Sequence, residues 1–493
     1  MFSCPTLVLF KSPNQKPFSF LSWEGDLSAF VRRTDWLPVF VIFGLTIWSV
    51  LAIYSTNSLN VPDFFAQEFP RKQLVFVGIG WVAYWAISVV EPALLERYAW
   101  WIYFFGIALL LPLAACALLH MDVRPFIEAR FGARRWIFLP GFSVQPSELV
   151  KTTTLILVSC MVGRGIVLER LFKPERLVAN VVLAILKLRV WRVFAAPLRP
   201  FVPLVIRMGW VVALPFGLIF LQPDLGSALI YIPMAFALLL IAGIPLRFFA
   251  ILALAALPGT ALLTVDMAAY GRALQQYQDF PPPNAKSDPA EGIRATYQGL
   301  LPIRNYHRER IMTLVAPRLI DPSGRGKEWQ PRQARMAVAR GGFSGQGFQN
   351  GTLVRLDWLP SAAAHNDFLF SCIAEESGFI GGCSIVGLLG LLVTLALRTA
   401  ARARNKFGAC IAVGVAVFAA VHVFVNIGMN IGLMPVTGVS LPFLSYGGSF
   451  ILSCFLLFGM AQSVHRNSQP LVVEEKDATE LKASSQLSAR APV

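Results

Sequence analysis

The sequence predicts an all-α polytopic membrane protein with about ten transmembrane helices. Of its 493 residues, 56% are hydrophobic and only 14% are charged, and the mean hydropathy is +0.60. A soluble globular protein carries about 25% charged residues, so this composition suits a bilayer better than water. Repeated apolar runs of about 20 residues, the length that crosses the hydrocarbon core, extend the prediction from composition to individual helices.

The predicted spans follow the apolar runs, with boundaries drawn to within several residues. They cover residues 36–55, 74–91, 99–119, 146–163, 203–221, 228–244, 248–266, 367–396, 409–430 and 449–463. The apolar stretch TLVLF near the N-terminus is too short for a signal peptide and ends at Lys11. We therefore expect the first long run, which follows Arg32 and Arg33, to be an uncleaved transmembrane helix.

Loop charge predicts which side of the membrane each loop occupies. An even number of spans places both termini on one side. Residues 164–207 and the link 398–406 are rich in arginine and lysine, so the positive-inside rule makes both cytoplasmic. The predicted organisation starts with a cytoplasmic segment 1–35, followed by helices 1–7 over 36–266 with a basic cytoplasmic loop near 164–202. A large extracytoplasmic loop, 267–366, then lies between helices 7 and 8. Helices 8–10 cover 367–463, and a cytoplasmic disordered tail covers 464–493.

The net charge of +15 would favour nucleic acid as a partner in a soluble protein. Here much of it follows from basic residues that orient helices, so no nucleic-acid partner is expected. The loop 267–366 is also basic, and long loops cross the membrane largely regardless of charge. We therefore expect an anion to meet this loop, either lipid headgroups or a phosphate-bearing substrate. The seven cysteines are scattered without a CxxC pair, which indicates neither a disulfide framework nor a zinc site.

Polar residues stand at the threshold of the fourth apolar run, in the stretch RWIFLPGFSVQPSELVK. Arg135, Gln145 and Ser147 lead into it, and Glu148 and Lys151 are three residues apart, so they share one face of a helix. Two interpretations stay open. The two charges either neutralise each other as a structural pair, or they line a polar cavity, which ionisable residues inside a membrane usually face.

Four further stretches interrupt the apolar pattern. QPDLGSAL breaks two apolar runs at Asp224, whose charge would be costly against lipid. RLIDPSGRG contains Asp321, which by itself reads as a turn residue. HNDFLFSCIAEESGFIGG places Asp367 at the entrance of an apolar helix. NIGMNIGLMPVTGVSLPFLSYGGSF is broken by proline and glycine, which indicates a re-entrant or packed loop.

Taken in this order, these stretches resemble the SEDS family of bacterial membrane proteins (shape, elongation, division and sporulation), over most of residues 30–465. The wording of the last stretch is more similar to the rod-elongation members than to the division members. The resemblance implies a peptidoglycan glycosyltransferase that polymerises lipid II, an undecaprenyl-pyrophosphate-linked disaccharide-peptide, at the outer face of the bacterial cytoplasmic membrane. It also implies a class B penicillin-binding protein and other elongation-complex membrane proteins as partners.

The resemblance assigns roles to individual residues. The family's catalytic aspartate lies in a D-P-x-G-x-G turn after an arginine-rich segment, which here gives Asp321 as the base that takes a proton from the sugar hydroxyl. Cations near the departing pyrophosphate, with or without a divalent metal (Mg or Mn), complete this chemistry. The expected substrate-binding residues are Lys151, Glu148, Arg135, Arg310, Arg308, Gln145, Ser147, Asp224 and Asp367. Beyond the turn, this chain has GRGKEWQPRQA where the family usually has a GYQ-like run.

Two other functions stay open. A lipid II flippase would also use broken helices and a polar path across the membrane. A scaffold that only recruits the penicillin-binding protein would leave the polar residues without a catalytic role. The long basic outer loop, with an acid in it rather than at the membrane midplane, favours the enzyme.

Overall fold

A computed structural model gives the fold of most of the chain. It describes residues 27–57, 67–119, 121–129, 134–140, 142–164, 201–280, 292–293, 297–301, 303, 305–324, 326, 328–352 and 364–468. Most of the basic loop near 164–202, most of the linker near 279–292 and most of the tail 464–493 lie outside the described residues.

A helix lies at each predicted span. These helices are α2 (Trp36–Asn57), α3 (Glu68–Ser88), α4 (Pro92–Leu119), α5 (Pro146–Gly163), α8 (Val202–Leu221), α9 (Leu225–Leu229) with α10 (Tyr231–Ile241), α11 (Leu246–Asp279), α18 (Leu369–Arg402), α19 (Lys406–Asn430) and α20 (Gly448–Ser468). Among the described residues, seven helices are long and apolar enough to cross a membrane. The helices α3, α5 and α9–α10 fall outside this set because they are shorter or more polar. The all-α polytopic fold is confirmed, and the number of ten spans stays a prediction.

The centre of the bundle consists of α5, α19 and α20, most of whose residues are buried. Helix α4 packs on α5, α18 packs on α19, and α3 packs on α20. Small residues permit the α3–α20 approach: a Cβ at Gly459 would lie 2.7 Å from the carbonyl oxygen of Tyr84. Close backbone approach at small residues is the usual way in which helices associate in lipid.

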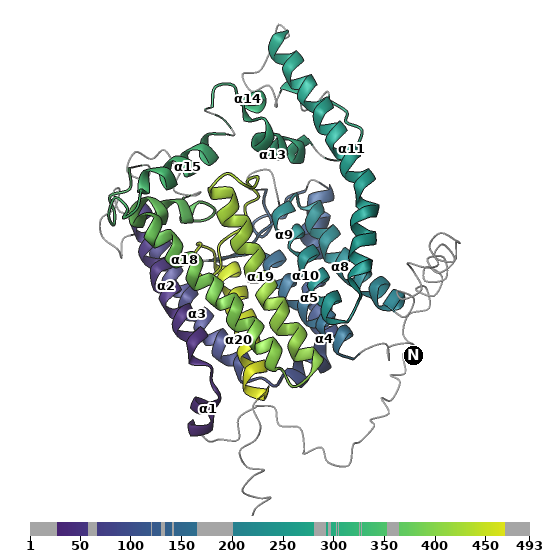
Figure 1. Ribbon diagram of the computed structural model, residues 1–493, viewed down its shortest axis with the longest axis vertical. Coiled ribbons are helices and arrows are strands. Elements are labelled where there is room, and N and C mark those ends of the chain that lie inside the picture. The colour runs from purple at the N-terminus through teal and green to yellow at the C-terminus, as the bar shows by residue number, and fades with distance from the viewer. Residues whose placement is uncertain are drawn as a thin grey trace, which may run out of the picture.

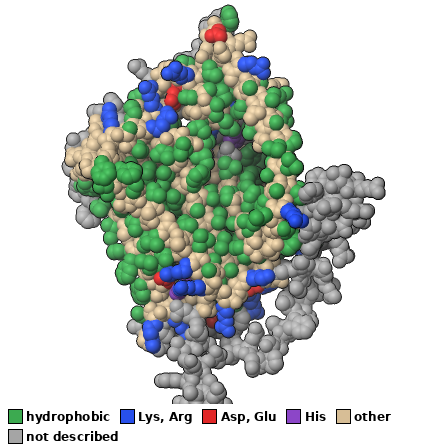
Figure 2. Space-filling model, viewed as in Figure 1, with side chains coloured by type: hydrophobic (Ala, Val, Ile, Leu, Met, Phe, Trp, Pro, Cys, Tyr) green, Lys and Arg blue, Asp and Glu red, His purple; other side chains and the backbone are tan. Residues whose placement is uncertain are grey.

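A cap lies over one end of this bundle, made of α13 (Asn305–Val315), α14 (Pro317–Ile320) and α15 (Trp329–Gly341) (Figure 1). At the opposite end lie α1 (Leu27–Arg33) and the C-terminal end of α20 (Figure 1). We call this the α1 end. A two-stranded hairpin, β1 (Ile137–Leu139) and β2 (Phe142–Val144), connects α4 to α5. Figure 2 shows hydrophobic side chains over the middle of the molecule and most basic side chains near its two ends, as a membrane-spanning bundle requires.

The glycine-rich segment ARGGFSGQG joins the cap to α18. Gly342, Gly345 and Gly378 have positive φ angles of 56°, 84° and 66°, which glycine adopts without steric cost. The N–H of Gln346 donates to Glu375 O at 3.0 Å, and the N–H of Phe379 donates to Gly342 O at 2.9 Å. These glycines therefore let the end of α15 pack against the outer part of α18, rather than approach a ligand.

Helix α11 contacts the bundle through Phe248 and Phe249 of its first turn and stands apart from it beyond them (Figure 1). None of the residues in its most apolar stretch is buried. Near its end, Tyr270 and Leu274 are buried against residues of α13 and α14. The helix continues to Asp279 instead of ending near residue 266 as expected. Residues 267–279 are MAAYGRALQQYQD, mostly good helix formers, which extend the span into the cap.

Candidate functional site at the cap end

The polar threshold of the fourth span forms the first two turns of α5. Gln145 precedes the helix, and Pro146 occupies its first turn, where the missing N–H costs nothing. The Nζ atom of Lys151 donates to Glu148 Oε1 at 2.8 Å. Their side chains are only 1% and 7% exposed, so the pair lies inside the bundle rather than at a solvated interface. The predicted shared face is confirmed.

The QPDLGSAL break brings α9 against this pair. Ser227 Oγ donates to Glu148 Oε1 at 3.3 Å, and the N–H of Ser227 donates to Asp224 Oδ1, also at 3.3 Å. Asp224 thus caps α9 with its carboxylate. Sequence reasoning missed Ser227 as a site residue, although it lies inside the stretch that drew attention to Asp224.

Gln145 and Arg135 close the arrangement. Gln145 Nε2 donates to Asp224 Oδ2 and to Ser147 Oγ, each at 3.1 Å. The Arg135 guanidinium lies 3.8 Å from Asp224 Oδ1 and donates to the carbonyl oxygens of Gln222, at 3.2 Å, and Pro223. We call the six predicted residues joined in this way the polar network: Arg135, Gln145, Ser147, Glu148, Lys151 and Asp224.

The loop 431–447, which contains the MPVTG stretch, lies against the network. At Gly226 a Cβ would lie 2.5 Å from Thr437 O, so α9 and this loop touch through their backbones. Arg310 of α13 reaches the same loop and donates from Nη1 to Val436 O at 2.7 Å. The cap, the α9 turn and the broken MPVTG segment therefore meet at one place.

Asp367 lies at the edge of this meeting point, half-buried just before α18. Asn426 and Asn430 of α19 donate to its backbone carbonyl at 3.1 and 3.0 Å. Burial raises the pKa of its carboxyl to about 6, although the positive charges of Arg310 and Arg135 act to lower it. Asn426 and Asn430 are a second omission of the sequence reasoning. The sequence did contain a signal for them, since two asparagines four residues apart share one face of an otherwise apolar helix.

Arg308 joins the cap to α11. It is 2% exposed, and its Nε donates to Asp266 Oδ2 at 2.8 Å. Its other nitrogens donate to Asn305 Oδ1 and to the carbonyl oxygens of Leu301 and Ile303. This geometry fastens α13 to α11 with four of the five N–H groups of Arg308, and its contact with substrate stays a prediction.

Asp321 ends α14 and closes the turn that follows it. Its Oδ1 accepts from Ser323 Oγ at 2.8 Å, and its Oδ2 accepts from the N–H groups of Gly326 and Glu328 at 2.6 and 3.3 Å. Burial alone would raise the pKa of Asp321, but these hydrogen bonds outweigh it and hold this pKa below its usual value. Among the residues that the structure describes, the carboxylate of Asp321 bonds only within this turn, and no bond joins it to the polar network.

The carboxylates give a limited set of metal ligands. Within the ranges that the structure describes, no group of three or more His, Cys, Asp or Glu side chains could hold a metal ion. Asp224 and Asp367 nevertheless lie within electrostatic reach of each other. Mg²⁺ often binds through one or two carboxylates together with substrate phosphates. The donor set therefore fits an ion that arrives with a phosphorylated substrate better than a resident one.

A hollow opens beside the site. Figure 2 shows it between α11 and the bundle, below the cap. Apolar side chains of α11 such as Leu254 and Leu257 are 62% and 57% exposed, so the helix contributes an uncovered apolar wall. A polar site with an apolar hollow beside it suits a substrate that has a charged head and a hydrocarbon tail.

The fold and site define a multi-pass membrane protein with a buried acid–base network under an extramembrane cap. Comparison with known proteins identifies the family. Residues 35–470 match the FtsW/RodA/SpoVE family of cell cycle proteins. The chain belongs to this family, which is the SEDS family, and the predicted resemblance is confirmed.

Individual relatives match over nearly their full length. A probable peptidoglycan glycosyltransferase FtsW from Trichlorobacter lovleyi is 29% identical, covering 90% of this chain and 96% of that protein. The peptidoglycan glycosyltransferase MrdB of Escherichia coli K12 is 26% identical, covering 93% and 98%. A chain from a peptidoglycan synthase complex, described as coordinating polymerization and crosslinking, is 25% identical with a TM-score of 0.58, covering 89% and 99%. Since relatives of the division type match as well, the preference for the elongation type stays a prediction.

Proposed function

We propose that this protein is a peptidoglycan glycosyltransferase that polymerises lipid II at the outer face of the bacterial cytoplasmic membrane. The observation that carries the proposal is the polar network beneath the cap, beside an apolar hollow. Relatives named as peptidoglycan glycosyltransferases match over 90% and 93% of the chain, which supports the same chemistry here. Because the reaction takes place at the outer face, the cap would be extracytoplasmic and both termini would be cytoplasmic.

The cations of the site would stabilise the departing pyrophosphate. Arg135, with 17% of its side chain exposed, and the half-buried Arg310 are the guanidiniums that a phosphate can reach. Lys151 lies behind Glu148, so we assign it to positioning the network rather than to direct contact. A divalent cation would be held by Asp224 and Asp367 together with the pyrophosphate, whose charge it would neutralise.

Asp321 is the proposed general base. Its lowered pKa keeps it ionised at neutral pH, which a proton acceptor must be, but also makes it a weak base. Ser323 and the backbone N–H groups now occupy its oxygens. Oδ1 accepts only the Ser323 hydroxyl among the described residues, so it keeps a lone pair that can accept the hydroxyl of the incoming sugar. The lipid tail would lie in the hollow beside α11.

The proposed partners follow from the same family. We propose a class B penicillin-binding protein, which cross-links the strands, together with other membrane proteins of the elongation complex, and no nucleic acid. The relative found in a synthase complex that coordinates polymerization and crosslinking supports the first of these.

One experiment tests the proposal: the purified protein is incubated with labelled lipid II, and glycan polymer is resolved on a gel. Asp321→Asn keeps the size and turn-forming capacity of the side chain but not a useful basicity. Loss of a general base typically costs about 10²–10⁴-fold in rate, while lipid II binding on the same preparation should change little. Activity of the variant within about threefold of the parent would reject Asp321 as the base. No polymer from the parent protein, with lipid II transport or recruitment alone, would favour the flippase or the scaffold.

A further inference from the structure

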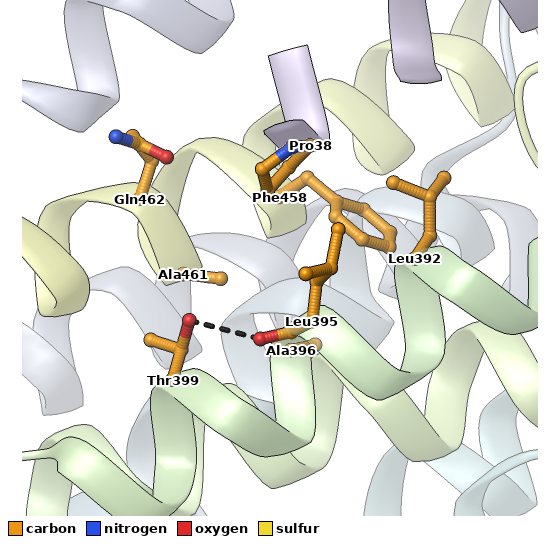
Figure 3. A pocket seen from close by; sticks show the side chains of 8 residues that line it. All are labelled: Pro38, Leu392, Leu395, Ala396, Thr399, Phe458, Ala461 and Gln462. Carbon is orange, nitrogen blue, oxygen red and sulfur yellow. Dashed lines mark hydrogen bonds between the residues drawn. The ribbon is translucent and has the colours of Figure 1, made fainter. Parts of the chain in front are cut away.

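Helices α2 and α18 each expose one side along their length. The exposed residues of α2 recur every three or four positions, as one face of a helix does; they are Leu37, Phe40, Phe43, Ile47 and Leu51. Those of α18 follow the same spacing; they are Phe379, Cys383, Val386, Gly390, Thr394 and Leu397. The opposite face of α18 lies inside the bundle, where Leu392, Leu395 and Thr399 line a small apolar pocket beside α2 and α20 (Figure 3). In a membrane-spanning bundle the two exposed sides are therefore the ones that contact lipid.

An ion pair and the helix lengths place the membrane boundaries on α2 and α18. At the α1 end, Asp35, which directly precedes α2, pairs with Arg398 of α18. Tyr54 lies 19 positions after Asp35, and Phe379 lies 19 positions before Arg398, which is roughly 28 Å along each helix. The hydrocarbon core of a bilayer is about 30 Å thick. If the ion pair marks one polar boundary, Tyr54 and Phe379 both lie at the other boundary, on the cap side.

The glycine-rich segment between α15 and α18 adds exposed aromatic rings at this second boundary. Phe343 and Phe379 are 71% and 63% exposed, and they stack with ring centres 6.3 Å apart. The exposed ring of Phe348 lies 6.5 Å from that of Tyr54, centre to centre. We call these four residues and the exposed Ile380 the aromatic patch. The patch continues the lipid-facing sides of both helices into the cap.

Hydrogen bonds fix the aromatic patch in this orientation. The N–H of Ile380 donates to Phe343 O at 3.2 Å. Gln349 adopts a φ of 60°, uncommon for a residue with a side chain, and its N–H donates to Glu376 Oε1 at 3.2 Å. The hydroxyl of Ser55, in α2, donates to the same carboxylate oxygen. The rings are therefore held outward in advance, which lowers the entropy lost when they bind.

We propose that the aromatic patch inserts into the membrane leaflet on the cap side and anchors the cap at the bilayer surface. Lipid is the partner that the structure favours, because the patch is continuous with two lipid-facing sides and lies at the level of the boundary. Apolar side chains of interfacial segments bury about 5–10 Å into the region between headgroups and acyl chains. Helix α15 ends at Gly341, where the segment that carries Phe343 begins, so insertion fixes this end of the cap at the membrane.

The test measures the depth of a fluorescent label on the patch, in the full chain reconstituted into phosphatidylcholine bilayers. Cys4→Ser with Cys383→Ala leaves five cysteines, all buried, so a single added cysteine takes the label. Nitroxide lipids then quench the label from either end of the acyl chain. With insertion of about 5–10 Å, a label on Phe348→Cys should be quenched about twofold more by the nitroxide near the headgroup than by the one near the chain end. Ile47→Cys, in the middle of α2, should show the reverse, and Arg318→Cys, exposed on α14, should be quenched mainly by aqueous iodide.

Two substitutions of the neighbouring ring form a matched pair. With the label at residue 348, Phe343→Ser should lower lipid quenching by about half, because it removes one of the inserted apolar groups, whereas Phe343→Leu should retain it. Both variants should keep the parent's thermal midpoint in detergent, since Phe343 is largely exposed.

Three results would overturn the proposal. They are equal quenching profiles at residues 348 and 318, equal lipid quenching in the serine and leucine variants, and protection of residue 348 from both nitroxide and iodide. The last result would mean that protein, such as a second copy of this chain, covers the patch. These measurements do not require polymerisation of lipid II, so failure here is distinct from failure of the proposed function.

Discussion

Lys151 keeps its charge inside the bundle because Glu148 lies one helical turn before it and contacts it at 2.8 Å. Removing one member of such a buried pair typically costs about 3–5 kcal/mol, while replacing both by apolar groups is often neutral. Stability alone therefore does not require the pair. Glu148 also accepts a hydrogen bond from Ser227, whose N–H donates to Asp224 at the N-terminus of α9. These bonds give the pair a positioning role that apolar residues could not fill.

A double variant separates the structural from the functional contribution of this pair. Lys151→Ala should lower both the yield of folded protein and polymerisation, since it leaves Glu148 buried and unpaired. Glu148→Gln combined with Lys151→Met should restore the folded yield, because the charges leave together. Polymerisation by the double variant should stay about 10²-fold below the parent, the loss expected for a preorganised polar site. Recovery of full polymerisation in the double variant would leave the pair with a structural role only.

Asp367 predicts a pH effect with a definite sign. With a pKa of about 6, its carboxyl is ionised at pH 7.5 and largely neutral at pH 5. When neutral, it no longer offsets the charges of Arg135 and Arg310, so with divalent cations chelated the affinity for the lipid pyrophosphate should rise as pH falls through 6, on the order of a few-fold. Asp367→Asn should remove this change of affinity with pH and should bind lipid II at pH 7.5 as tightly as the parent does at pH 5. Binding isotherms of lipid II at both pH values check this, and an unchanged step in the variant would assign it to the substrate.

At the scale of elements, the site depends on how α9 is pressed against the loop 431–447. Asp224 and Ser227 belong to the α9 turn, and this turn reaches Thr437 only because residue 226 has no side chain. Arg310 fixes the same loop from the cap side through Val436 O. The contact at Gly226 therefore sets the positions of Asp224, of Ser227 and of the loop that Arg310 of the cap contacts.

Gly226→Ala should disturb this contact, because its Cβ would lie 2.5 Å from Thr437 O. Overpacking of this kind costs about 1–3 kcal/mol, which we expect as a lower thermal midpoint together with weaker polymerisation. Gly217→Ala, in α8, is the matched control, since no atom lies within 4 Å of its added Cβ. It should keep activity and the thermal midpoint. Equal behaviour of the two variants would show that the α9 contact tolerates displacement.

The sequence predicts elements better than the contacts between them. Apolar runs place the spans, and residue types mark Glu148, Lys151 and Asp224 as unusual in a membrane. No spacing rule joins residue 135 to residue 224, or 310 to 436, because those pairs arise only when the helices pack. Arg308 illustrates the limit. Its partner Asp266 lies at the predicted end of the seventh span, and only the extension of α11 into the cap brings the two together.

At the scale of the molecule, the two ends of the bundle have different chemistry. The cap end combines carboxylates, guanidiniums and a lateral hollow, whereas at the α1 end basic residues of α1, of α18 and of the link to α19 predominate. The cap end therefore has the components that the proposed reaction requires. This asymmetry is useful only if the ends face different compartments, which makes membrane orientation the central assumption of the proposed function.

Reporter fusions test that orientation directly. A fusion near Lys286, between α11 and the cap, should report the extracytoplasmic side, and one near Arg176, between α5 and α8, the cytoplasmic side. The physical reason is the concentration of basic residues at 164–207 and at the α18–α19 link, which resist transfer across the membrane in short loops, whereas long loops cross regardless of charge. A third fusion at Arg404, in that short link, should agree with the one near Arg176. Agreement of Arg404 with Lys286 instead would require an even number of crossings between them and would remove the cap from the side where lipid II is polymerised. The polar network would then lie on the wrong side for the proposed reaction, and a transport role would replace it.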